Sequence, residues 1–155
     1  MTYRIEGLRH DQFQPLFDLT ERQLAAQGAR RVTADSPTGY PCRVSLEDAR
    51  PGEELMLLNY VSHDVDGPFR TTYGIFVRKD AAARARYTDE TPEYLERRTL
   101  GLRGFDADGM LKGGLLALPG EADAKIRELL DRPEIESIHA HNAALGCFLA
   151  RIERN

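Results

Sequence analysis

The segment EELMLLNYVSHDVDGPFRTTYGIFV, residues 53–77, decides the fold class of this chain. Its first part contains an unbroken apolar run from Leu55 to Leu58, which is typical of a strand that is covered on both faces and lies centrally in its sheet. Turn-forming residues follow at 62–68, and residues 69–77 then return as a second strand. The segment therefore predicts an antiparallel hairpin whose first strand is central.

Two further hairpins follow from the same kind of pattern. TLGLRGF (residues 99–105) and MLKGGLLAL (residues 110–118) flank the turn sequence DADG. EIESIHAH (residues 134–141) and GCFLARIER (residues 146–154) are joined by NAAL, and TYRIEGL near the N-terminus alternates as a half-exposed strand does. The glycine pair inside the second segment predicts a bulge or the close approach of another group.

Two longer stretches have helical spacing. Residues 11–28 predict one helix that is capped by Asp11, tolerates Pro15 in its first turn and ends at Gly28. Residues 121–132 predict a second helix that Pro133 stops, and a short helix is expected to open at Pro92. The pattern predicts an α+β fold: a mostly antiparallel sheet built from hairpins, with two main helices, and residues 1–155 as a single domain.

Composition restricts the partners that we expect. The net charge of −4 gives no basic field for nucleic acid or an anionic lipid surface. No apolar stretch approaches the ~20 residues of a membrane helix, and no secretory signal is recognisable, so we expect a cytoplasmic protein with two reduced cysteines. Eighteen of the 21 cationic residues are arginines. That bias would favour a carboxylate or phosphate ligand, but the simpler explanation is a GC-rich genome that encodes its cations as arginine.

Two Asp-x-Asp-Gly sequences, at 64–67 and 106–109, resemble part of a calcium loop. An EF-hand also needs a glutamate at its twelfth position, where this chain has Ile75 and Ala117. Aspartate and glycine form turns for their own reasons, so we predict no calcium site. No glycine-rich loop has nucleotide-binding spacing, and no cofactor is predicted.

The stretch SIHAHNAALGC, residues 137–147, concentrates the reactive side chains. On a strand, His139 and His141 share one face. Zinc requires three or four protein ligands in recognisable spacing, so no metal is predicted. Cys147 is a candidate nucleophile if His139 or His141 activates its thiol, and the alternative is a buried cysteine that acts as a small apolar residue.

A third interpretation is a non-covalent pocket rimmed by side-chain donors that suit a small anionic or polar ligand. Its catalytic candidates are His139 and Cys147, because a histidine carries protons near neutral pH. The structural alternative is that the same groups only tie loops to the sheet by hydrogen bonds. The predicted ligand-binding residues are Cys42, Arg43, Arg103, His139, His141 and Asn142.

Four segments together resemble a bacterial domain-of-unknown-function family, number 1203, over about Tyr40 to Arg154. They are YPCRVSLEDARPGEELMLLNY, YGIFVR, RGFDADG and IHAHNAALGCFLARIER. The resemblance implies a small standalone protein without an assigned activity, cofactor or partner. The family's recurrent positions fall here on Cys42, Arg43, Gly52, Phe76, Arg103, Gly104, His139 and Cys147.

The chain departs from the family pattern near its candidate site. Arg78 stands where a histidine is usual, a nearby cysteine is missing, and His141 replaces an arginine. These departures argue against metal or redox chemistry in this member. We therefore expect a protein that binds a small anionic or polar ligand, with enzymatic turnover left open. The alternative is a non-enzymatic interaction protein, a homodimer or larger homo-oligomer paired through an exposed sheet edge, whose polar cluster is purely structural.

Overall fold

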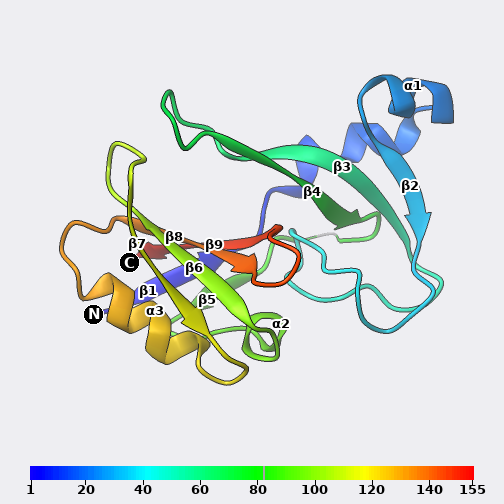
Figure 1. Cartoon of the computed structure of the whole chain (residues 1–155). Coiled ribbons are helices and arrows are strands. Elements are labelled where there is room, and N and C mark those ends of the chain that lie inside the picture. The colour runs from blue at the N-terminus through cyan, green and yellow to red at the C-terminus, as the bar shows by residue number, and fades with distance from the viewer. Residues whose placement is uncertain (82) are drawn as a thin grey trace.

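The computed structural model describes residues 1–81 and 83–155, which form two antiparallel sheets (Figure 1). The large sheet has the strand order β5-β1-β9-β8-β6-β7, and the small sheet has the order β2-β3-β4. The α+β class and the mostly antiparallel pairing are thus confirmed. The strands are β1 (Tyr3–Glu6), β2 (Arg30–Thr33), β3 (Glu54–His63), β4 (Thr71–Arg78), β5 (Arg86–Thr88), β6 (Leu100–Phe105), β7 (Leu111–Ala117), β8 (Ser137–Asn142) and β9 (Phe148–Arg154).

Helix α3 (Ala122–Leu130) covers one face of the large sheet (Figure 1). Its apolar side, with Ile126 and Leu130, packs on Leu102 of β6 and on Ile138 of β8, and all four side chains are buried. The predicted second helix is therefore confirmed. Because this face is filled by α3, the alternate residues of β6 and β8 must point to the opposite face of the sheet.

Strand β3 is central in the small sheet, as its apolar run predicts. Leu55 and Met56 are fully buried, but Leu57 is only half-buried and Asn59 is exposed. The expectation that both faces of this strand are covered is therefore wrong in its middle. Partner strands pair along the edges of β3 and leave its faces to other segments. Ala49 and Tyr40 of the preceding loop pack on Leu55, but Leu57 is not part of that cluster.

The single helix predicted for residues 11–28 is wrong. The chain instead forms 3₁₀ segments at His10–Gln12 and Gln14–Asp18 and a separate helix α1 (Glu21–Ala26). The break occurs at Thr20, whose backbone is extended and whose side chain accepts a hydrogen bond from the Gln23 amide. The Thr20 amide in turn donates to Oε1 of the Gln23 side chain, and this capping box starts a new helix.

Several local expectations are confirmed. A short helix α2 (Glu93–Glu96) begins after Pro92. A β-carbon on Gly113 would overlap the guanidinium of Arg132, and one on Gly114 would lie 2.9 Å from a backbone oxygen, so close approach explains both glycines. Strands β2 and β5 were not predicted, because their sequences are short and polar. No helix of the described residues is long and apolar enough to cross a bilayer.

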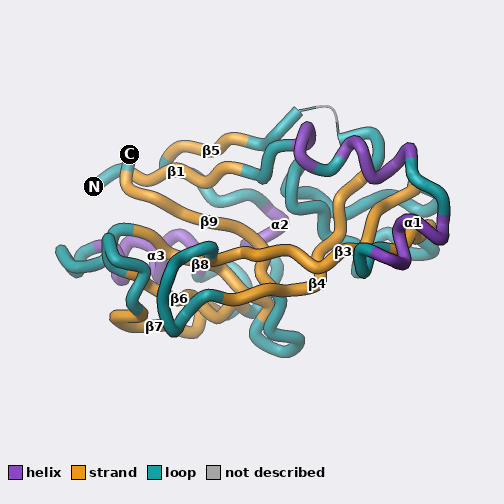
Figure 2. Tube along the Cα trace, turned by 90° about the horizontal axis from the view of Figure 1, so that it is seen from above, coloured by secondary structure: helices purple, strands orange, loops and turns teal. Residues whose placement is uncertain are grey.

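The β3–β4 hairpin lies against the large sheet on the face opposite α3 (Figure 2). The His63 ring at the end of β3 is centred 4.1 Å from the Phe105 ring and 4.9 Å from the His139 ring. Farther along, the Tyr73 ring of β4 is centred 5.0 Å from that of His141. Rings from β3, β4, β6, β8 and β9 thus form one layer between the sheets, which we call the ring layer; its members are His63, Tyr73, Phe105, His139, His141 and Phe148.

Candidate functional site

His139 and His141 point to the same face of β8, as the period-two pattern predicts. They do not face an open polar cavity, and that expectation is corrected. Their side chains are 1% and 2% exposed and pack among the rings of the ring layer. The pattern identified the shared face, but the β3–β4 hairpin that covers this face comes from a distant part of the sequence.

Burial keeps both histidines neutral. Burial first, and then electrostatic interactions with His63 and Arg151, lower the pKa of His139 to about 3. Burial also lowers the pKa of His141 to about 4, although a hydrogen bond to the Gly146 carbonyl opposes the shift. Because that bond joins Nδ1 to a carbonyl oxygen at 3.0 Å, Nδ1 of His141 carries the ring proton. Among the described residues, Nε2 of His139 has no hydrogen-bond partner.

Two predicted arginines connect distant segments. The Arg43 side chain is almost fully buried, and its Nε donates to the Phe148 carbonyl at 2.8 Å. Its Nη1 donates to the Pro41 carbonyl at 2.5 Å. Arg103 donates to the Tyr73 hydroxyl at 2.9 Å, which joins the large sheet to the small sheet. Arg103 reaches the ring layer through Tyr73, and Arg43 reaches the backbone of Phe148. Arg43 and His141 are buried, whereas Arg103 is half-buried.

Asn142 stabilises the β8–β9 turn. The sequence interpretation had assigned this residue to ligand binding. Its Oδ1 accepts hydrogen bonds from the amides of Ala144 and Leu145 at 3.0 and 2.9 Å. These two bonds fix the β8–β9 turn, so the acceptor oxygen is already used.

The two cysteines are free thiols in different surroundings. Cys42 is fully buried, and its sulfur lies 3.3 Å from the Arg78 amide nitrogen, which donates to it. Cys147 is half-buried at the start of the last strand. Nδ1 of His141 is engaged with the Gly146 carbonyl, and the His139 ring contacts other rings. In the described part of the chain, neither histidine forms a hydrogen bond with a thiol.

Tyr94, which the sequence interpretation missed, lies beside the predicted Arg43. Burial raises the pKa of its phenol to about 12, and the charges of Arg43 and Arg98 oppose that shift. Arg43 and Tyr94 donate hydrogen bonds to consecutive carbonyls, those of Phe148 and Leu149. The Tyr94 hydroxyl donates to the Leu149 carbonyl at 3.3 Å, and the Arg98 guanidinium lies 4.8 Å from the ring centroid.

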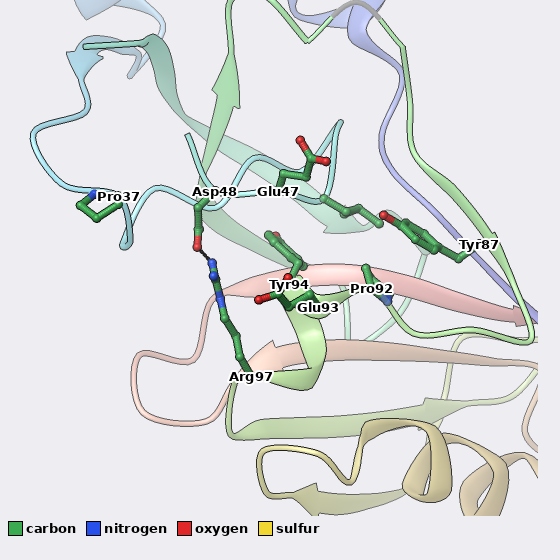
Figure 3. A pocket seen from close by; sticks show the side chains of 9 residues that line it. Pro37, Glu47, Asp48, Tyr87, Pro92, Glu93, Tyr94 and Arg97 are labelled. Atoms are coloured by element: carbon green, nitrogen blue, oxygen red, sulfur yellow. Dashed lines mark ion pairs between the residues drawn. The ribbon is translucent and has the colours of Figure 1, made fainter. Parts of the chain in front are cut away.

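One side of Tyr94 borders a cavity of about 300 Å³ between the loop of residues 37–48 and helix α2 (Figure 3). We call it the Tyr94 cavity. Loop, helix and strand β5 each contribute to its wall, so segments about 50 positions apart in the sequence form one site. Its lining residues are Pro37, Leu46, Glu47, Asp48, Tyr87, Pro92, Glu93, Tyr94 and Arg97.

Asp48 organises the charges at one end of the Tyr94 cavity. Its side chain is 4% exposed and receives two hydrogen bonds from Arg98, at 2.8 and 3.1 Å. Arg97 forms a second ion pair with the same carboxylate, as the dashed line in Figure 3 shows. The Arg98 side chain is 13% exposed and that of Arg97 is 39% exposed. Arg98 is thus the interior partner of Asp48, and Arg97 is the partner at the cavity surface.

Sequence signals for this cavity were present but not distinctive. Asp48 lies in the segment that carries the family resemblance, and Arg97–Arg98 is a pair of cations directly after a short helix. Neither motif has a spacing that belongs to one chemistry. Only the contact between the loop and the helix gives the three residues a common role.

Comparison with known proteins identifies one family. A family model described as "Protein of unknown function (DUF1203)" matches residues 39–154, which is most of the chain. Neither a curated protein nor a solved structure matches the sequence. The matched region begins just before Cys42 and includes every residue of the predicted cluster, as well as Asp48, Tyr94 and Arg97.

Proposed function

The chain belongs to the DUF1203 family, as its sequence segments predicted, and because that family has no known function we propose from the geometry that the protein binds a small polar ligand in the Tyr94 cavity. Cavities of about 300–1,000 Å³ with a few converging polar groups are typical of small-molecule sites. The Tyr94 cavity lies at the small end of that range.

The observation that carries the proposal is the pair of arginines on one carboxylate. Two cations compete for Asp48, and Arg98 alone supplies both of its oxygens with hydrogen bonds. An anionic group that enters the cavity can therefore pair with Arg97 in place of Asp48. The Asp48 carboxylate still has Arg98 as its partner, so it is not left buried and unpaired. Arginine suits this exchange because its planar guanidinium binds carboxylate or phosphate through two parallel hydrogen bonds.

The cluster predicted from the sequence serves this proposal as the inner wall of the site. Arg43 links the loop of residues 41–43 to the Phe148 carbonyl, and Tyr94 donates to the next carbonyl, that of Leu149. We assign these side chains to the support of Tyr94 rather than to contact with ligand. Binding without turnover is the activity we propose, because His139 and His141 are neutral, buried and engaged in ring packing.

The experiment is a titration of ¹⁵N-labelled protein with inorganic phosphate and with acetate, followed by amide chemical shifts and by the melting temperature. We expect shifts near Asp48 and Arg97 and a rise in melting temperature, because a ligand that binds only the native state stabilises it. Arg97→Ala should abolish both effects. Arg9→Ala is the control, since Arg9 is exposed and, within residues 1–81 and 83–155, forms an ion pair with nearby Asp11 alone. Equal responses of the two variants would contradict the proposal.

A second candidate function is self-association through strand β7, and one surface feature favours it. β7 is one of the two outer strands of the large sheet, and Leu111, Leu116 and Leu118 on and beside it are exposed. Unpaired edges with exposed apolar side chains pair readily with other strands. Arg132 donates to the Lys112 carbonyl and so covers part of this edge. This candidate is tested by light scattering of the wild type and of Leu116→Lys across a concentration series. We expect the wild type to form a dimer and Leu116→Lys to be monomeric.

A further inference from the structure

We propose that a second cavity, formed by arginines on the large sheet, binds a phosphoryl dianion such as inorganic phosphate or the phosphate group of a monoester. The cavity has a volume of about 170 Å³ and shares no lining residue with the Tyr94 cavity. The proposal therefore adds a site and does not rest on the proposed function. We call this site the arginine cavity; the charged residues that line it are Arg4, Glu6, Arg84, Arg151 and Glu153.

Strand pairing places these side chains on the face of the large sheet that lies opposite α3. The alternate residues of β1 pack in the core beneath α3, so Arg4 and Glu6 point to the other face. Across β9, Arg4 is paired with Glu153 and Glu6 with Arg151, and residues paired directly across two strands lie on the same face. The β3–β4 hairpin covers this face near β8 and β6, whereas the five charged side chains are 30–52% exposed. An ion in solution can therefore reach them.

Each of the two glutamates is shared by two arginines. The four ion pairs are Arg4–Glu153 and Arg151–Glu153, each at 2.7 Å, and Arg84–Glu6 and Arg86–Glu6, at 2.9 and 3.6 Å. Four cations on two carboxylates leave an excess of two positive charges on this part of the sheet, although the whole chain has a net charge of −4. A phosphoryl dianion carries about two negative charges at neutral pH, so its charge matches the excess.

The arginines can change partners without leaving a carboxylate alone. An anion that pairs with one arginine of each glutamate leaves the other arginine in place, and exposed ion pairs of this kind contribute little to stability. Arg84 is held in position because its Nε donates to the Gly7 carbonyl at 3.0 Å, so binding costs it little conformational freedom. The guanidinium plane then offers the anion parallel hydrogen bonds, a geometry that suits phosphate. The volume of the cavity suits a single phosphate group rather than a whole nucleotide.

The acids around the arginine cavity leave this charge balance in place. Within residues 1–81 and 83–155, the two shared glutamates are the only acids that line it. Asp64 and Asp106 line the next cavity beside Arg151, and each pairs with a cation of its own. Asp80 lies in a third cavity with Arg84 and is exposed, so solvent and salt screen its charge.

The test compares inorganic phosphate, glycerol phosphate, sulfate and acetate in amide chemical-shift titrations of the wild type. We expect the three dianions to shift the amides around Arg4, Gly7 and Arg151 and to bind about fivefold more tightly than acetate, which is the effect of one additional exposed ion pair. A phosphate monoester loses its second charge near pH 6. Binding of glycerol phosphate should therefore weaken about two- to threefold relative to sulfate between pH 7.5 and 5.5, because sulfate keeps both charges.

Substitutions of opposite sign separate binding from a purely structural role. Arg84→Gln and Arg151→Gln should each weaken phosphate binding about fivefold. Glu6→Gln should strengthen it, because it frees arginines from a competing carboxylate, and the loss of a merely structural ion pair would not do so. Arg22→Gln is the matched control, since Arg22 is exposed on α1 and its loss changes the net charge equally. The altered side chains are half-buried or exposed, so we expect every variant to fold, and circular dichroism verifies this.

The outcomes also distinguish the two cavities. If Arg84→Gln and Arg151→Gln bind phosphate as the wild type does, or if acetate binds as tightly as phosphate, the arginine cavity is refuted. If phosphate shifts only the amides near Asp48 and Arg97, the arginine cavity is refuted and the Tyr94 cavity stands. With phosphate, the test of the Tyr94 cavity is carried out in the Arg84→Gln background, so that a change in melting temperature belongs to that cavity alone.

Discussion

The ring layer predicts a steep loss of stability in mild acid. His139 and His141 have native pKa values of about 3 and 4, far below the value of 6.5 for a free histidine. Between pH 6.5 and 4 the unfolded chain therefore binds protons that the native protein does not. Stability rises with pH wherever the unfolded state binds more protons, so it must fall as the pH is lowered through this window.

The magnitude follows from the two shifts. At pH 5 an unfolded histidine is largely protonated while its native counterpart is neutral, which costs about 2 kcal/mol for each residue and about 4 kcal/mol for both. That is a large part of the roughly 5–15 kcal/mol by which a domain is stable. Carboxylates with lowered native pKa values, such as Glu53 and Asp123, lose their contribution only as the pH approaches and falls below about 4.

The assay is urea unfolding followed by far-ultraviolet circular dichroism at intervals from pH 7.5 to pH 5. His139→Phe keeps a ring in the layer and removes one titrating group, so its free energy of unfolding should depend on pH about half as steeply as that of the wild type. Ile138→Val is the control, because Ile138 faces α3 and its truncation costs about 1 kcal/mol at every pH. A wild-type free energy that does not change between pH 7.5 and 5, or an unchanged slope in His139→Phe, would refute this account of the layer.

Three further predictions follow from burial and close contact. Met56→Asp should prevent folding, because it buries an unpaired carboxylate at a cost of several kcal/mol, whereas Leu57→Asp at a half-buried site should give a folded protein with a lower melting temperature. Gly7→Ala should lower the free energy of unfolding by more than about 1 kcal/mol, measured in urea, because its β-carbon would overlap a backbone carbonyl. Cys147 should react with a thiol reagent in the native protein, and Cys42 only after denaturation; equal rates would contradict the burial of Cys42.

Much of the fold was predictable because its signals are local. Alternation over a few residues places His139 and His141 on one face, and turn-forming residues between apolar runs define the β3–β4, β6–β7 and β8–β9 hairpins. The apolar spacing of residues 121–132 predicts α3 for the same reason. In each case the residues that carry the pattern lie within one strand, one turn or one helix. The local sequence is therefore enough to predict that element.

One error has a local cause, and the others arise from pairing between distant segments. The apolar residues of the segment 11–28 have helical spacing, but the reciprocal bonds between Thr20 and Gln23 start the helix late. Strands β2 and β5 carry little apolar pattern, and they become strands because each pairs with a neighbour, β3 or β1. Pairing between strands supplies backbone hydrogen bonds that cannot be predicted from a short polar sequence.

By itself the sequence determined the α+β class, the hairpins, the family and the shared face of His139 and His141. Only the tertiary structure decided which of them are accessible. It covered the histidine face with a hairpin from residues 54–78, and it brought Asp48 against Arg97 and Arg98 at the wall of a cavity. The physical reason is that burial and charge pairing depend on contacts between segments far apart in the chain, and periodicity reports only the face on which a side chain lies.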